Sequence, residues 1–120
     1  MKDNIIAEKS KAFAVRVIKL YQYLSEIKKE YILSKQILRS GTSVGANIRE
    51  AIQAQSRNDF IHKMNIALKE ASETEYWLEL LHETGYITAE EYQGIISDCS
   101  EINRILTSIV KSTKGKSTDK

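Results

Sequence analysis

The sequence predicts an all-α protein, an antiparallel up-down-up-down four-helix bundle. The 120 residues include no proline and only five glycines, and such a composition favours long helices over strands and tight turns. Apolar residues recur at alternating spacings of three and four along four stretches of the chain, which is the spacing of one helix face. Short connections between long helices place successive helices antiparallel. We expect the bundle at residues 1–111 and a flexible lysine-rich tail at residues 112–120.

The first two helices are predicted from their apolar rows. The first is expected from Asn4 to Ile27, and the second from Tyr31 or Leu33 to Gln55. The core row of the first helix, interrupted by the polar Ser10, is Ile6, Phe13, Val17, Leu20, Leu24 and Ile27. The core row of the second is Ile37, Gly41, Val44, Ile48 and Ala51. Glycines in a helix interior cost about 1 kcal/mol each, so Gly41 and Gly45 indicate close approach of another helix.

The last two helices carry end signals as well as apolar rows. Ser56 and Asp59 resemble a capping box that opens the third helix, and Gly85 is placed to end it after Thr84. Thr88 and Glu91 form a second capping box, and the fourth helix is expected to run to about Lys111. The core row of the third helix is Phe60, Met64, Ala67, Ala71, Thr74, Leu78 and Leu81, and that of the fourth is Tyr92, Ile95, Cys99, Ile102, Leu106 and Ile109.

A polar row runs beside the core row of the second helix. Because a buried polar group without a partner costs about 1–3 kcal/mol, we expect these residues to pair with charged residues nearby. The predicted network that fixes helix register comprises Gln36, Arg39, Ser40, Ser43, Asn47, Glu50, Arg57, Glu70 and Glu73; Arg49 is a further candidate partner for the carboxylates. The alternative is that the same row forms a ligand or nucleic-acid site.

Some helices have more apolar surface than one core needs. A second apolar row lies on an adjacent face of the third helix, and comparable flanks lie on the first and fourth helices. Such rows belong either to a wide monomeric core or to an oligomer interface. We predict a homo-oligomer whose interface includes Ile66, Trp77, Leu80, Ile18 and Tyr21.

Charge is unevenly distributed along the chain. Residues 1–55 carry ten basic and five acidic residues, whereas residues 56–110 carry four basic and ten acidic residues. The first half therefore attracts polyanions, unless the two halves face each other within the bundle or between subunits. The candidate nucleic-acid-binding residues are Lys9, Lys11, Arg16, Lys19, Lys28, Lys29, Lys114 and Lys116.

The sequence contains no complete catalytic, metal-binding or cofactor-binding motif. The segment 40–45 is rich in glycine and hydroxyls but lacks the lysine of a phosphate-binding loop. Glu79 and His82 have the spacing of a di-iron ligand pair, but no second pair lies on another helix. Cys99 falls in a core row, where a small apolar side chain is expected. We expect a non-enzyme without metal or cofactor. The absence of a signal peptide or an apolar run long enough to span a membrane predicts a cytoplasmic location.

The second and third helices resemble a known family. The segments that carry the resemblance are Gln36–Ile37, Arg39–Ser40, Thr42–Val44, Ala46–Ile48, Glu50, Ser56–Arg57, Phe60 and Ala67–Leu78. They are similar to the bacterial four-helix-bundle proteins encoded in 23S rRNA intervening sequences, also called S23 ribosomal proteins. The resemblance implies a ring-like homopentamer. It also implies kinship with the accessory variability determinant of diversity-generating retroelements, a basic pentamer that binds nucleic acid and a reverse transcriptase.

Two functions follow as hypotheses. The first is a non-catalytic, homo-oligomeric accessory protein that binds RNA or DNA. The alternative is a protein-interaction scaffold that makes no contact with nucleic acid. The partners expected are therefore other copies of the chain, RNA or DNA, or another protein, and no membrane.

Overall fold

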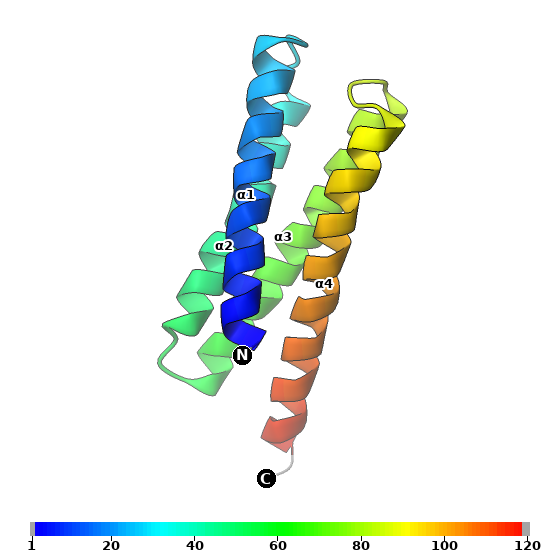
Figure 1. Cartoon of the computed structure of the whole chain (residues 1–120). Helices are drawn as coiled ribbons and strands as arrows, with labels where there is room; N and C mark the ends of the chain where they lie inside the picture. The colour runs from blue at the N-terminus through cyan, green and yellow to red at the C-terminus, as the bar shows by residue number, and fades with distance from the viewer. Residues whose placement is uncertain (1, 119–120) are drawn as a thin grey trace.

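The computed structural model describes the backbone of residues 2–118 and the side chains of residues 5–115, and the regular elements of this part are all helices. They are α1 (Lys2–Glu26), α2 (Leu33–Ile52), α3 (Arg57–Glu83) and α4 (Ala89–Thr118). The helices run alternately up and down in a bundle of 53 × 22 × 21 Å (Figure 1). Around the bundle α1 packs against α2, α2 against α3, α3 against α4 and α4 against α1. The predicted four-helix fold is confirmed.

The predicted core rows form one buried apolar core. Of the residues expected there on α2, α3 and α4, all are buried except Phe60 and Tyr92, which are half-buried and pack against the core. On α1 the row is buried from Ile6 to Leu24, including Ser10, apart from half-buried Leu20. The prediction for Ile27 is wrong, because α1 ends at Glu26 and Ile27 lies in the following turn with 67% of its surface exposed.

The predicted helix ends around α3 and α4 are confirmed by their hydrogen bonds. The Asp59 N–H donates to Ser56 Oγ at 3.0 Å, which caps the N-terminus of α3. At the start of α4, Glu91 N–H donates to Thr88 Oγ1 at 3.1 Å and Thr88 N–H donates to Glu91 Oε1 at 2.8 Å. These reciprocal bonds are those of a capping box.

Gly85 ends α3 as predicted. Its φ of 83° lies in the left-handed region, which glycine adopts without a Cβ clash. The N–H of Tyr86 donates to the carbonyl of Leu81 at 2.9 Å, and the N–H of Gly85 donates to that of His82 at 3.1 Å. This pair of bonds is a Schellman motif, which satisfies carbonyls that have no partner inside the helix.

Three other helix bounds differ from the prediction, of which the first is the start of α1, at Lys2 in place of Asn4. Helix α2 ends at Ile52, before the expected Gln55, and α4 continues to Thr118, past the expected end near Lys111. No proline interrupts residues 112–118, and lysines in the last turns of a helix interact favourably with its dipole. The polar composition of this segment therefore does not stop the helix.

The glycines of α2 lie where α1 approaches most closely. A Cβ placed on Gly41 would lie 2.8 Å from both Cγ atoms of Val17, and one placed on Gly45 would lie 3.4 Å from Ser10 Oγ. The first distance is shorter than any normal contact, whereas the second is an ordinary one. Gly41 therefore sets how closely α1 and α2 pack.

Cys99 is a core residue, as predicted. Its side chain is fully buried, and its Sγ lies 3.4 Å from the carbonyl oxygen of Ala71. Burial, reinforced by the negative charges of Glu75 and Asp98, raises the pKa of the thiol to about 12. A thiol that stays protonated at neutral pH is a poor nucleophile.

Candidate nucleic-acid interface

Part of the predicted polar network forms between α2 and α3. Arg39 pairs with Glu73, and its Nη1 lies 3.2 Å from Glu70 Oε1. Trp77 Nε1 donates to Glu73 Oε2 at 3.0 Å. The hydrogen bond from Trp77, together with Arg39, lowers the pKa of Glu73, so the stabilisation it provides is present at neutral pH and is lost on acidification. This cluster connects the two helices at their outer edge.

The rest of the predicted network is local or absent. The hydroxyls of Ser40 and Thr74 lie 2.8 Å apart in the core between α2 and α3. Ser43 and Asn47 instead donate to carbonyls one turn earlier in their own helix. Glu50 pairs with Lys63 at 2.8 Å, where the sequence suggested an arginine.

The polar row of α2 is therefore not a continuous buried network. Gln36, Glu50 and Arg57 are exposed, and among the described residues no side-chain bond joins Gln36 or Arg57 to the other members. Each residue of this row precedes a buried core position by one residue, so a 100° step places the row on the flank of the buried face of α2, and its ends at Gln36 and Glu50 reach solvent.

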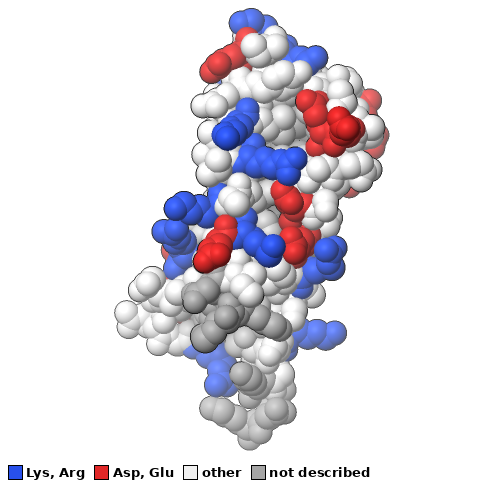
Figure 2. All heavy atoms as spheres, viewed as in Figure 1, with Lys and Arg blue, Asp and Glu red and all other residues white. Residues whose placement is uncertain are grey.

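Two of the predicted nucleic-acid-binding residues are neutralised by α4. Lys9 pairs with Glu101 at 3.2 Å, and Arg16 pairs with Asp98 at 2.7 Å while it also donates to the carbonyl of Gly94. In the view of Figure 2, basic side chains gather over α1 and acidic side chains over α4, and the two signs meet between these helices. On this side of the bundle, the opposite charges of the two halves of the chain face each other.

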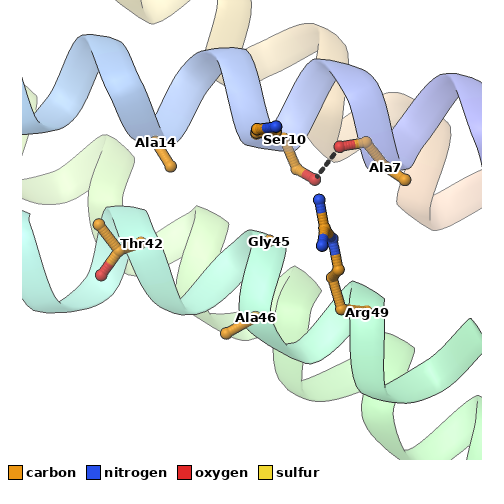
Figure 3. Close-up of a pocket in the computed structure, with 8 residues that line it drawn as sticks. Ala7, Ser10, Ala14, Thr42, Gly45, Ala46 and Arg49 are labelled. Atoms are coloured by element: carbon orange, nitrogen blue, oxygen red, sulfur yellow. Dashed lines mark hydrogen bonds between the residues drawn. The ribbon is translucent and has the colours of Figure 1, made fainter. Parts of the chain in front are cut away.

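A hollow of about 220 Å³ lies on the other side of α1, between α1 and α2. Its floor consists of small side chains from both helices, namely Ala7, Ser10, Ala14, Thr42, Gly45 and Ala46. The hydroxyl of Ser10 is turned inward, where it donates to the carbonyl of Ala7 at 3.1 Å (Figure 3). Small residues keep the hollow open, so another molecule can approach the two helix backbones closely.

Two basic residues border this hollow. Lys11 comes from α1 and Arg49 from α2, both are exposed, and neither forms an ion pair with any other described side chain. In Figure 3 the side chain of Arg49 extends from α2 across the hollow towards Ser10. The sequence predicts Arg49 as a candidate partner for Glu50, Glu70 or Glu73, and the structure places it beside the hollow instead. The sequence does not show which neighbour a helix face meets, because the rotation of each helix is fixed by packing. The one feature of the sequence that indicates this placement of Arg49 is its position one helix turn after Gly45.

The remaining predicted basic residues are distributed over the surface. Lys19, Lys28, Lys29 and Lys114 are exposed. The ammonium group of Lys28 lies over the ring of Tyr23, 5.9 Å from its centroid. The side chain of Lys116 lies outside the described residues. The turn between α1 and α2, which contains Lys28 and Lys29, lies at the opposite end of the bundle from the last turns of α4, which contain Lys114 (Figure 1), so the predicted residues form separate groups and not one patch.

The predicted interface residues lie on two helices that are diagonally opposite in the bundle. Ile66, Trp77 and Leu80 are half-buried on α3, whereas on α1 Ile18 is exposed and Tyr21 is half-buried. Helices α1 and α3 lie diagonally across the bundle, where their backbones are not neighbours, and each packs beside α2 and α4. Trp77 also packs against the core and against the ring of Tyr76, at 5.2 Å between centroids.

Metal ligands do not gather anywhere in the described residues, where no group of three or more His, Cys, Asp or Glu side chains could hold an ion. The two candidates Glu79 and His82 belong to the α3 surface, and His82 stacks on Tyr92 with 4.5 Å between ring centroids. Over the same residues, no helix has the length and apolar character required to cross a membrane.

Comparisons with known proteins agree with the predicted resemblance to the 23S rRNA intervening-sequence proteins. The family description that matches is "23S rRNA-intervening sequence protein", over residues 2–108. A crystal structure of a Bacteroides thetaiotaomicron protein of unknown function from the S23 ribosomal protein family is 65% identical, with a TM-score of 0.92. The alignment covers 92% of this chain and 99% of that one. No curated protein matches the chain. This chain belongs to the 23S rRNA-intervening sequence protein family.

Proposed function

We propose that this protein is a non-catalytic, homo-oligomeric accessory protein that binds the phosphate backbone of structured RNA through the α1–α2 face. The observation that supports this most is the hollow bordered by Lys11 and Arg49. These cations have no acidic partner among the described side chains, whereas Lys9, Arg16, Arg39 and Lys63 each have at least one. Unneutralised cations beside a small-residue floor suit a phosphate chain that lies close to the helices.

The family adds a direction to this proposal. Its description refers to 23S rRNA, which favours RNA over DNA as the nucleic acid to test. The resemblance to the accessory variability determinant extends the proposal to a pentamer that acts in the bacterial cytoplasm. The acidic second half of the chain is consistent with binding through one face only, because it would repel a polyanion that approached α3 or α4.

Binding to a fluorescently labelled structured RNA is expected to weaken steeply as salt rises, because each phosphate contact releases counterions. Replacing both Lys11 and Arg49 with alanine should weaken binding and reduce the slope of log K against log salt by about one for each phosphate that is no longer neutralised. Fluorescence anisotropy between about 50 mM and 200 mM salt measures both quantities.

The matched control is Lys69→Ala, which removes one positive charge from the exposed surface of α3. It should leave the slope almost unchanged. Absence of binding at the lowest salt would refute the proposal and would favour the scaffold function, for which a protein partner should survive nuclease treatment in a pull-down. An equal loss in the control and in the Lys11 and Arg49 variants would show non-specific attraction.

Homo-oligomerisation is supported by the two separate apolar sets on α1 and α3. A ring built from identical contacts requires two different, complementary surfaces on each subunit. The sets on α1 and α3 meet that requirement, since the two helices lie diagonally opposite each other in the bundle. The charges also suit it, because α1 and α2 are basic, whereas α3 and the part of α4 up to residue 110 are acidic.

Replacing Trp77 with alanine should dissociate the oligomer more than it unfolds the monomer, because a half-buried indole beside Leu80 offers apolar area to a neighbour. Light scattering measures the mass, and circular dichroism measures the folded fraction at the same concentration. Trp77→Phe keeps most of the apolar area but loses the hydrogen bond to Glu73, so it should retain the mass. An unchanged mass in the alanine variant would exclude Trp77 from the interface.

A further inference from the structure

The turn between α1 and α2, residues 27–32, presents large apolar side chains to water. We call it the α1–α2 tip. Ile27 is 67% exposed, Tyr31 53% and Ile32 75%. Single exposed apolar residues are ordinary, but three of them within six consecutive residues form a patch that usually marks a contact site.

The tip is held in one conformation. Lys29 adopts a left-handed φ of 57°, and the N–H of Glu30 donates to the carbonyl of Leu24 at 2.9 Å. The side chain of Glu30 is 9% exposed and points inward. Its carboxylate accepts hydrogen bonds from three backbone N–H groups, those of Ile32 at 3.2 Å, Leu33 at 2.9 Å and Ser34 at 2.7 Å. Because these hydrogen bonds fix the turn, its apolar side chains are exposed in the folded structure and not because a helix end has frayed.

Charge at the tip is predominantly positive. Lys28, Lys29 and Lys35 are exposed, whereas the carboxylate of Glu30 is used inside the turn. Glu26, in the last turn of α1, is the one exposed carboxylate in residues 26–35. The surface therefore offers an aromatic ring and aliphatic side chains together with several cations.

We propose that the α1–α2 tip binds unpaired nucleotides of a structured RNA. Tyr31 stacks on an exposed base, Ile27 and Ile32 pack against neighbouring bases or sugars, and the lysines contact the flanking phosphates. This inference rests on the proposed RNA-binding function and adds to it the class of RNA that is preferred. These apolar side chains can pack only against bases that are free to unstack, and a perfectly paired A-form helix offers no such bases.

The rest of this end of the bundle disfavours an anionic membrane as the occupant. The turn between α3 and α4 lies at the same end as the tip (Figure 1), and there Glu83, Glu90 and Glu91 are exposed. A flat bilayer would meet both turns and be repelled by these carboxylates. An RNA loop is narrow enough to meet the tip alone, so the charge distribution favours RNA.

The experiment compares two RNAs of equal length and charge, a hairpin whose loop contains 2-aminopurine and a fully paired duplex. Wild-type protein is expected to bind the hairpin roughly tenfold more tightly than the duplex, which corresponds to the free energy of one base–aromatic stack. Binding should also change the 2-aminopurine fluorescence. Tyr31→Ala should abolish the preference and the fluorescence change, while Tyr31→Phe should keep both. Tyr76→Ala is the matched control, since Tyr76 is also 53% exposed but lies on α3.

The outcomes separate this inference from the proposed function. Equal binding of both RNAs that is unaffected by Tyr31→Ala would refute the role of the tip and leave RNA binding through the α1–α2 hollow intact. No binding of either RNA would refute both. Sedimentation of the protein with phosphatidylglycerol vesicles, lost in Ile32→Ser, would assign the tip to a lipid surface and overturn the inference. Circular dichroism of each variant establishes that it is folded.

Discussion

Replacing Gly41 with alanine is expected to destabilise the protein by about 2 kcal/mol, although alanine is the better helix former. The added methyl group would lie 2.8 Å from both Cγ atoms of Val17, and Gly41 and Val17 are fully buried. Valine in a helix has one strongly preferred rotamer, so it cannot turn aside. Overpacking of this kind costs about 1–3 kcal/mol, which exceeds the gain of about 1 kcal/mol in helix propensity.

Gly45→Ala is the matched control for this prediction. The same methyl group there would lie 3.4 Å from Ser10 Oγ, an ordinary contact, so the propensity gain should dominate and raise stability by up to about 1 kcal/mol. Urea unfolding at one fixed protein concentration measures both variants. In a Val17→Ala background, Gly41→Ala should be tolerated much better, because its clashing partner is gone. Equal stabilisation by the two glycine replacements would contradict the proposed close contact.

Replacing Glu30 with alanine should lower the free energy of unfolding by about 2–3 kcal/mol. One nearly buried carboxylate accepts three backbone N–H groups at the start of α2, and bonds to a charged acceptor are stronger than neutral ones. The neighbouring Ile32, at the cap position, provides no side-chain bond. Without Glu30, the three backbone N–H groups would have no side-chain acceptor.

Two further replacements separate the causes of that loss. Glu30→Gln keeps an oxygen acceptor and removes the charge, so it should lose about half as much stability as the alanine variant. Glu26→Ala removes an exposed carboxylate from the preceding helix turn and should stay within about 0.5 kcal/mol of wild type. Chemical denaturation with a shared m-value measures all three. If Glu30→Ala lowers the free energy of unfolding no more than Glu26→Ala does, water accepts the backbone hydrogen bonds in place of the carboxylate.

Much of the fold was predictable because it depends on local rules. The apolar rows, the N-cap at Ser56, the capping box at Thr88 and the Schellman motif at Gly85 are all specified by residues within one or two turns of each other. The end of α1 was not predictable in this way. Ile27 continues the apolar row in the sequence, but Lys29 and Glu30 reverse the chain before that residue reaches the core.

The candidate sites depended on contacts between helices, which no local rule supplies. Lys9, Lys11 and Arg16 look alike in the sequence. The structure neutralises the first and last with α4 but places Lys11 beside the hollow. Arg49 joins Lys11 there and not the carboxylates of α3. Glu30 falls between the first two predicted helices, where no sequence signal marks it as a cap. Its capping role appears only once the turn folds its carboxylate back onto the start of α2.

The sequence by itself determined that this protein is a four-helix bundle with a given set of core residues, because helical periodicity and end signals are local and repeated. It also identified the family, through the segment from Gln36 to Glu50 and its continuation in α3. Only the tertiary structure decided which cations remain without a counter-charge and which apolar side chains remain in water. Both depend on the rotation of each helix and on the path of each turn, and those are set by packing across the whole bundle.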